Sequence, residues 1–76
     1  MMPLCFCNVG EENTIRKIGG SPEVKKHLEN LGFVVGLQGL EPGTVMIVNK
    51  LGGNVIVNVK KARVAISEEM AQKIMV

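Results

Sequence analysis

The sequence predicts a small, mainly β domain in which about five short strands form a barrel and one α-helix is inserted at about residues 21–31. Three observations support this fold class. Apolar residues alternate with a period of two in the second half of the chain, glycine pairs separate the apolar runs, and one earlier segment has clear helix start and stop signals. With 76 residues, the chain is expected to fold as a single domain, 1–76.

The inserted helix is the best-defined element. Ser21 is placed to cap its N-terminus, and Pro22 suits the first helical position because its missing N–H has no partner there anyway. Gly32 is expected to end the helix in a left-handed conformation, and Phe33 to fold back over the last turn. The apolar stripe at helical spacing consists of Val24, Leu28 and Leu31.

Two hairpins are predicted after the helix. Gly52-Gly53 is a turn signal between two predicted strands. In the strand before it, Val45, Ile47 and Leu51 alternate only loosely with Met46 and Asn49, consistent with partial burial on both sides. In the strand after it, the residues that point one way are Val55, Val57 and Val59. Lys60-Lys61 turns the chain again before a strand whose inner face has Ala62, Val64 and Ile66.

The two ends of the chain are less distinctive. Residues 4–9 are read either as an opening strand or as an apolar lead-in, residues 10–13 as a turn, and residues 14–18 as a short strand with Ile15 inward. Near the other end, Ser67 can cap a short helical turn at about residues 67–72. A final short strand is expected at residues 74–76.

Composition excludes several function classes. The net charge is only +2 and the chain has two aromatic residues, Phe6 and Phe33, so neither a massed basic face nor a base-stacking surface for nucleic acid is expected. The longest apolar run within the body of the chain is residues 45–48, far short of the roughly 20 residues that a spanning helix needs. With no signal-peptide pattern and no disulfide framework, we expect a cytoplasmic protein that does not insert into a membrane.

Catalysis is not expected, because the chain has one histidine, His27, and offers only Cys5 or Cys7 as a nucleophile beside it. Metal binding is the sharper alternative. If residues 5–7 are extended, both thiols lie on the same side and can chelate a soft ion such as Fe or Zn, with Glu11, Glu12, His27 or a second copy supplying further ligands. The alternative is that both cysteines are small apolar residues without a ligand.

The chain resembles the FeoA family of ferrous iron transport accessory proteins. The similarity is found in the helix SPEVKKHLENLGF followed by VVG, in IVNKLGGNVIVNVKKARVAI, and in the ending SEEMAQKIMV. It implies an SH3-like barrel, a domain also found in iron- and manganese-dependent repressors. It also implies a cytoplasmic partner for FeoB, the membrane iron transporter with a GTPase domain. The family has no shared catalytic residues, so no enzyme activity and no required cofactor are implied.

Two departures from the family pattern stand out. Residues 37–42, LQGLEP, form an extension before Gly43, which either lengthens the loop beneath the helix or starts the next strand early. The turn at Lys60-Lys61 has two lysines where Gly, Asp or Asn is common, which suggests a different turn type or selection for charge.

We therefore expect a binding module that docks on the cytosolic part of the transporter through the exposed helix side and the following loop. Self-association into a weak homo-oligomer is left open. The basic cluster Lys60, Lys61 and Arg63 is read as solvated surface or as a contact for an acidic partner. The candidate docking residues are Lys25, Lys26, Glu29 and Leu40.

Overall fold

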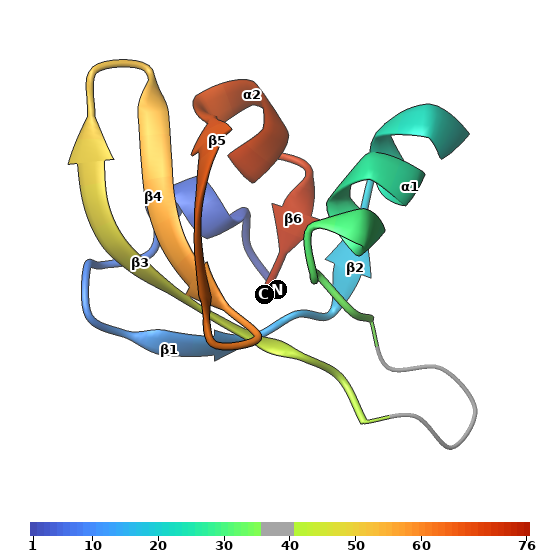
Figure 1. Ribbon diagram of the computed structural model, residues 1–76, viewed down its shortest axis with the longest axis horizontal. Helices are drawn as coiled ribbons and strands as arrows, with labels where there is room; N and C mark the ends of the chain where they lie inside the picture. Colours follow the sequence, from blue (N-terminus) through green and yellow to red (C-terminus); the bar gives the residue numbers. More distant parts are fainter. Residues whose placement is uncertain (36–40) are drawn as a thin grey trace.

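A computed structural model describes residues 1–35 and 41–76 as a small two-sheet β-barrel with one longer helix (Figure 1). The first sheet has the order β1 (Glu12–Thr14), β3 (Thr44–Leu51), β4 (Asn54–Val59) and β5 (Ala62–Ser67), with every neighbouring pair antiparallel. The second pairs β2 (Lys17–Ile18) with β6 (Ile74–Met75). The described part of the chain thus contains six strands, and the predicted mainly β fold with about five strands is confirmed.

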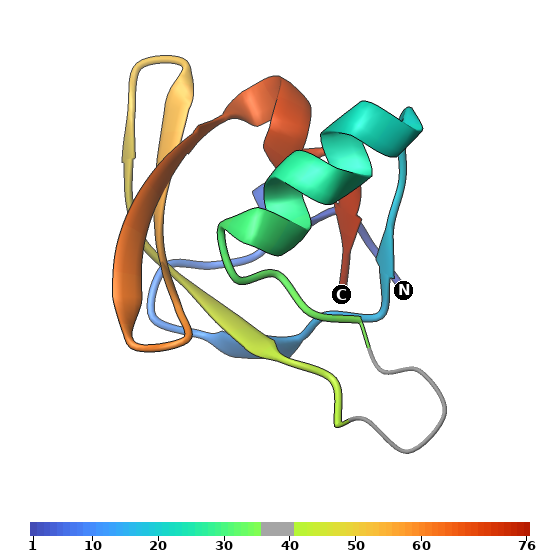
Figure 2. The same cartoon turned by 45° about the vertical axis from the view of Figure 1, so that its right-hand side comes forward.

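The inserted helix is confirmed as α1 (Pro22–Asn30), and it lies beside the β2–β6 sheet, on the other side of the core from the β3–β4 hairpin (Figures 1 and 2). The Ser21 hydroxyl accepts from the Val24 N–H at 3.3 Å. At the other end Gly32 has φ +109°, its N–H donates to the Glu29 carbonyl, and the N–H of the next residue, Phe33, donates to the Leu28 carbonyl. These two bonds form a Schellman motif, which the Gly-Phe pair predicts.

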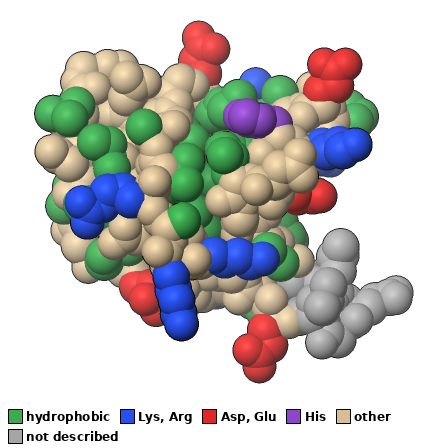
Figure 3. Space-filling view, in the orientation of Figure 1, with side chains coloured by type: hydrophobic (Ala, Val, Ile, Leu, Met, Phe, Trp, Pro, Cys, Tyr) green, Lys and Arg blue, Asp and Glu red, His purple; other side chains and the backbone are tan. Residues whose placement is uncertain are grey.

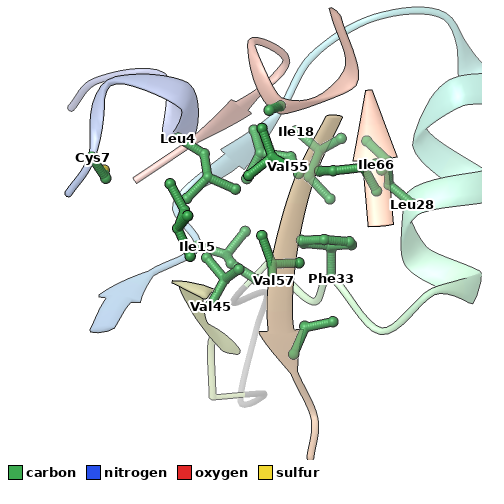
Figure 4. Packing of buried hydrophobic residues seen from close by; sticks show 14 residues of the cluster. Leu4, Cys7, Ile15, Ile18, Leu28, Phe33, Val45, Val55, Val57 and Ile66 are labelled. Atoms are coloured by element: carbon green, nitrogen blue, oxygen red, sulfur yellow. The ribbon is translucent and has the colours of Figure 1, made fainter. Parts of the chain in front are cut away.

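The core lies between the sheets and α1 (Figure 4). Alternation along β4 buries its three valines and leaves Ile56 and Asn58 half-exposed, as a strand with one core face requires. Phe33 is fully buried, whereas Leu51 is 56% exposed. The alternation along β3 is loose because its register shifts between Ile47 and Asn49, so the residues after this bulge no longer follow the alternation before it.

The first part of the chain corrects two predictions and decides between the two alternatives for residues 4–9. These residues form no strand; they contain the 3-10 helix η1 (Leu4–Phe6), which buries Leu4. The segment predicted as a turn at residues 10–13 contains the start of β1, and the single strand predicted at 14–18 is divided between β1 and β2. The predictions failed here because the pairing partners, β3 and β6, lie far along the sequence.

The last elements agree with the sequence. The short helix α2 (Glu68–Ala71) begins after Ser67, whose hydroxyl accepts from the Met70 N–H at 3.2 Å. The two chain ends lie side by side (Figure 1), because Met2 and Val76 exchange two backbone hydrogen bonds of 2.9 Å. Ile74 of β6 is fully buried, so the C-terminal strand helps to close the core.

Within the extension at residues 37–42, residues 37–40 lie outside the described residues, so both roles suggested for them stay predictions. Glu41 and Pro42 are exposed and belong to no strand, and β3 begins at Thr44. The Gly43 N–H donates to the Val34 carbonyl at 2.8 Å. This bond joins the chain before and after the extension.

Candidate functional site

The proposed docking residues on α1 are solvent-exposed. Lys25, Lys26 and Glu29 all lie on the side of the helix that does not contribute to the core, whereas Leu28 is fully buried. The caps at both ends fix the helix and therefore the presentation of these three charged side chains. The fourth candidate, Leu40, lies outside the described residues, and its role stays a prediction.

The two cysteines differ in burial. Cys7 is 2% exposed and belongs to the core cluster, whereas Cys5 is half-buried beside it, and both are free thiols. The segment is not extended as predicted, because residues 4–6 form η1. Burial raises the pKa of the Cys7 thiol, the nearby Glu11 carboxylate and Cys5 add to the rise, and Lys50 opposes it. A raised pKa favours the neutral thiol, which is a poor metal ligand and nucleophile.

His27 is not brought to the cysteines. It is exposed on α1 next to Leu28, and Figure 4 places Leu28 and Cys7 at opposite ends of the buried cluster. Within residues 1–35 and 41–76, no three His, Cys, Asp or Glu side chains gather closely enough to hold a metal ion. The structure therefore offers no assembled ligand set for the metal hypothesis and no cysteine–histidine pair.

The β4–β5 turn is conformationally strained. The register pairs Val59 with Ala62, so Lys60 and Lys61 form a two-residue loop, and their φ values are +48° and +63°. Positive φ at both positions defines a type I′ turn, which favours Asn-Gly or Gly-Gly. The suggestion of a different turn type is wrong: the lysines adopt the positive-φ turn, at a cost of roughly 1–2 kcal/mol per residue.

Lys60 has a structural partner. A Cβ placed on Gly32 would lie 3.5 Å from Lys60 Cδ, so the lysine stem crosses the C-terminal end of α1. A positive charge near a helix C-terminus is favourable because the last carbonyls carry partial negative charge. Packing on the helix end thus accounts for Lys60, whereas the contacts at Gly32 do not include the exposed Lys61.

A pocket of about 350 Å³ opens beside this turn. Its walls include both lysines, Asn58 of β4, Met46 of β3 and Glu12 of β1. The lysine cluster can be recognised in the sequence. The pocket cannot, because Glu12 and Met46 come together only through the pairing of β1 with β3.

Comparisons with known proteins decide the family. The family model described as FeoA domain matches residues 2–76. The chain belongs to the FeoA domain family. A protein named Fe(2+) transport protein A, from Methanocaldococcus jannaschii, is 30% identical over 76 residues, covering 100% of this chain and 85% of that protein. The family resemblance seen in the sequence is thus confirmed, and membership implies a role in ferrous iron transport.

A solved structure supports the fold. The chain is similar to the crystal structure of an iron uptake regulatory protein (FeoA), with a TM-score of 0.77 and 23% identity, covering 97% of this chain and 90% of that one. At this identity the likeness bears on the fold alone, and it confirms the SH3-like barrel. No helix in the described part of this FeoA-family chain has the length and apolar character needed to cross a bilayer.

Proposed function

We propose that this chain is a cytoplasmic accessory protein of ferrous iron uptake that binds the cytosolic, GTPase-containing region of a FeoB-type membrane transporter. The observation that supports it is the match to the FeoA family over residues 2–76. The activity expected is binding and regulation rather than catalysis. The structure adds a helix that is capped at both ends and has exposed charged side chains.

The docking surface proposed is the exposed side of α1 together with the loop that follows it. Lys25, Lys26 and Glu29 provide charge-complementary contacts, which mainly set association rate and orientation. Leu40 is proposed as an apolar contact. The three charged residues are exposed, so a partner can approach them without disturbing the core.

A pull-down with the isolated cytosolic region of the transporter tests this proposal. Reversing two charges with Lys25→Glu and Lys26→Glu is expected to weaken capture strongly. The matched control is Arg16→Glu with Lys17→Glu, which reverses two exposed charges on another element. Equal capture of both variants removes α1 from the proposal, and failure of the wild-type chain to bind removes the partner.

Leu40 is tested separately with Leu40→Ala. A contact residue at the centre of an interface is expected to weaken binding on truncation, because apolar anchors contribute most of the binding energy. Isothermal calorimetry with the same transporter region measures the change. Unchanged affinity excludes Leu40 as an anchor.

Direct binding of iron or zinc by Cys5, Cys7 and His27 stays a prediction. It requires Cys7 to leave the core and His27, which is exposed on α1, to be brought to the cysteines. Titration of the reduced protein with Fe(II) or Zn(II), compared with Cys5→Ser plus Cys7→Ser, separates the outcomes. Tight binding that the double variant abolishes supports a metal site, and binding unaffected by it excludes the cysteines.

A further inference from the structure

The pocket beside the β4–β5 turn lies on the outer face of the four-stranded sheet. Asn58 stands between the buried residues Val57 and Val59, so its side chain points to the opposite, solvent side. Met46 and Glu12 follow across the sheet, since Met46 pairs with Asn58 and Glu12 pairs with Met46. One cross-strand row therefore forms the length of the pocket.

Arg63 extends this row on β5. It is the register partner of Asn58, and its Nε donates to the Asn58 Oδ1 at 3.5 Å. The pocket has two lysines, Lys60 and Lys61, at its β4–β5 side and one carboxylate, Glu12, at its β1 side. Arg63 lies next to this wall, because it is bonded to Asn58. Figure 3 shows Lys and Arg side chains over the lower end of β4 and β5, apart from those over α1.

The strained turn indicates that charge is favoured here over conformation. Strained backbone that persists in a structure is a pointer to function, because any glycine or asparagine would relieve it. Contact with Gly32 explains Lys60 but leaves Lys61 without a structural reason. A positive φ destabilises the fold at a lysine, and solvation of the side chain does not offset this cost.

We propose that this pocket, with Arg63 at its rim, binds an acidic segment of a partner protein. Aspartate or glutamate carboxylates would accept hydrogen bonds from Lys61 and Arg63, for which a guanidinium is well suited. The mixed lining favours a peptide over a free phosphate. A peptide also offers N–H donors toward Glu12 and carbon atoms toward Met46, whereas a phosphate offers mainly negative charge that Glu12 repels.

The site is independent of the transporter docking proposed above. It uses β1, β3, β4 and β5 rather than α1, and the test needs only the isolated chain and a peptide. Failure of one proposal therefore leaves the other standing.

The experiment titrates isotope-labelled protein with a short peptide of alternating Glu and Ser, followed by amide NMR shifts. Low salt, about 50 mM, keeps screening weak. We expect shifts around Thr44, Met46, Asn58 and the β4–β5 turn. A peptide of alternating Gln and Ser, identical in length, is expected to give none. Shifts spread over the surface, or equal shifts with the Gln peptide, overturn the proposal.

Matched variants locate the contact. Lys61→Gln with Arg63→Gln is expected to weaken binding about tenfold, since each loses a charge-assisted hydrogen bond. Arg16→Gln with Lys17→Gln removes the same charge at exposed positions outside both proposed sites and is expected to leave the affinity within about twofold, the remaining effect being long-range and screened. Equal weakening by both pairs means non-specific attraction and overturns the site.

Two further arms keep the result unambiguous. Lys61→Gly fits the turn and keeps the fold, so weaker binding by this variant reflects the lost side chain rather than a damaged sheet. Inorganic phosphate is titrated in parallel under the same conditions. Tighter binding of phosphate than of the Glu peptide, with the same shifted amides, would make this a small-anion site and overturn the proposal.

Discussion

The two hairpin turns of the four-stranded sheet have the same length and opposite chemistry. The β3–β4 turn is Gly52-Gly53, in which Gly52 has φ +59°, and the β4–β5 turn is Lys60-Lys61, with positive φ at both positions. Glycine adopts this conformation without a Cβ clash, whereas lysine does not. The glycine turn therefore adopts its conformation without strain, whereas the lysine turn places two charges at the cost of backbone strain.

The surroundings of the turns explain how the strained one persists. Nothing lies within 4 Å of a Cβ placed on Gly52, so the glycine turn projects into open space. The lysine turn is held instead, because the Lys60 stem packs on Gly32 and the paired strands continue to Val59 and Ala62 on either side. Strain persists where neighbouring structure fixes the conformation.

The largest expected effect comes from removing the packing at the helix end that the lysine turn contacts. Phe33, which follows Gly32, is fully buried, and Phe33→Ala is expected to cost about 3–5 kcal/mol through lost burial and a cavity. Urea unfolding measures this. A loss below about 1 kcal/mol would show that the site collapses without a cavity and that the lysine turn does not depend on it.

The next largest effect is expected when a lysine is placed in the glycine turn. Gly52→Lys introduces at the glycine turn the residue type that the other turn tolerates. Because the added side chain meets no neighbour, the expected loss of about 1–2 kcal/mol is conformational only. This lowers the melting temperature by roughly 4–8 °C per kcal/mol. An unchanged melting temperature would mean that positive φ costs lysine nothing in this sheet.

The reverse exchange is expected to stabilise the protein. Lys61→Gly relieves positive-φ strain and adds glycine entropy to the unfolded chain, for a net gain of about 0.5–1 kcal/mol. Thermal unfolding at low and at high salt checks it, since a gain that disappears at high salt would reflect relief of repulsion among Lys60, Lys61 and Arg63 instead. A loss of stability would show that Lys61 has a structural role and would weaken the argument for selection of charge.

The helix α1 could be predicted because its start and stop signals are local in sequence. The pocket could not, because it depends on pairing between strands that are far apart in the sequence. Ser21, Pro22 and Gly32 determine the helix through neighbours within four residues, so its ends agree with the sequence. The type of the lysine turn was not predicted because residue preference alone disfavours positive φ at lysine. The right-handed twist of the paired strands nevertheless favours a type I′ or II′ turn in a two-residue loop.

The candidate sites divide in the same way. The exposed charges of α1 follow from helical spacing, and the basic residues at 60–63 are visible in sequence. Glu12 enters the pocket only through pairing with Met46, across more than thirty intervening residues. The burial of Cys7 was hidden for the same reason, because η1 packs against α2 and the core rather than against its own neighbours in sequence.

The smallest expected effect concerns the lysine near the glycine turn. Lys50 Nζ donates to the Cys5 carbonyl at 3.0 Å, so this lysine, unlike Lys61, has a structural partner, and it opposes the rise in the pKa of Cys7. Because the folded-state pKa of Cys7 lies above that of the unfolded chain, the unfolded thiol loses its proton first as pH rises. The stabilisation is complete below the unfolded-state pKa and is lost as pH rises through the folded-state pKa.

Urea midpoints of the reduced protein between pH 7 and about pH 10 measure this loss against Cys7→Ala, which has no thiol to titrate at that position. The wild-type midpoint is expected to fall more steeply with pH than that of the variant. Lys50→Gln should extend the fall to higher pH and enlarge it, because the charge that favours the thiolate in the folded state is gone. Parallel curves for wild type and Cys7→Ala would show that burial does not perturb this thiol, and the cysteine pair would then regain its standing as a metal ligand.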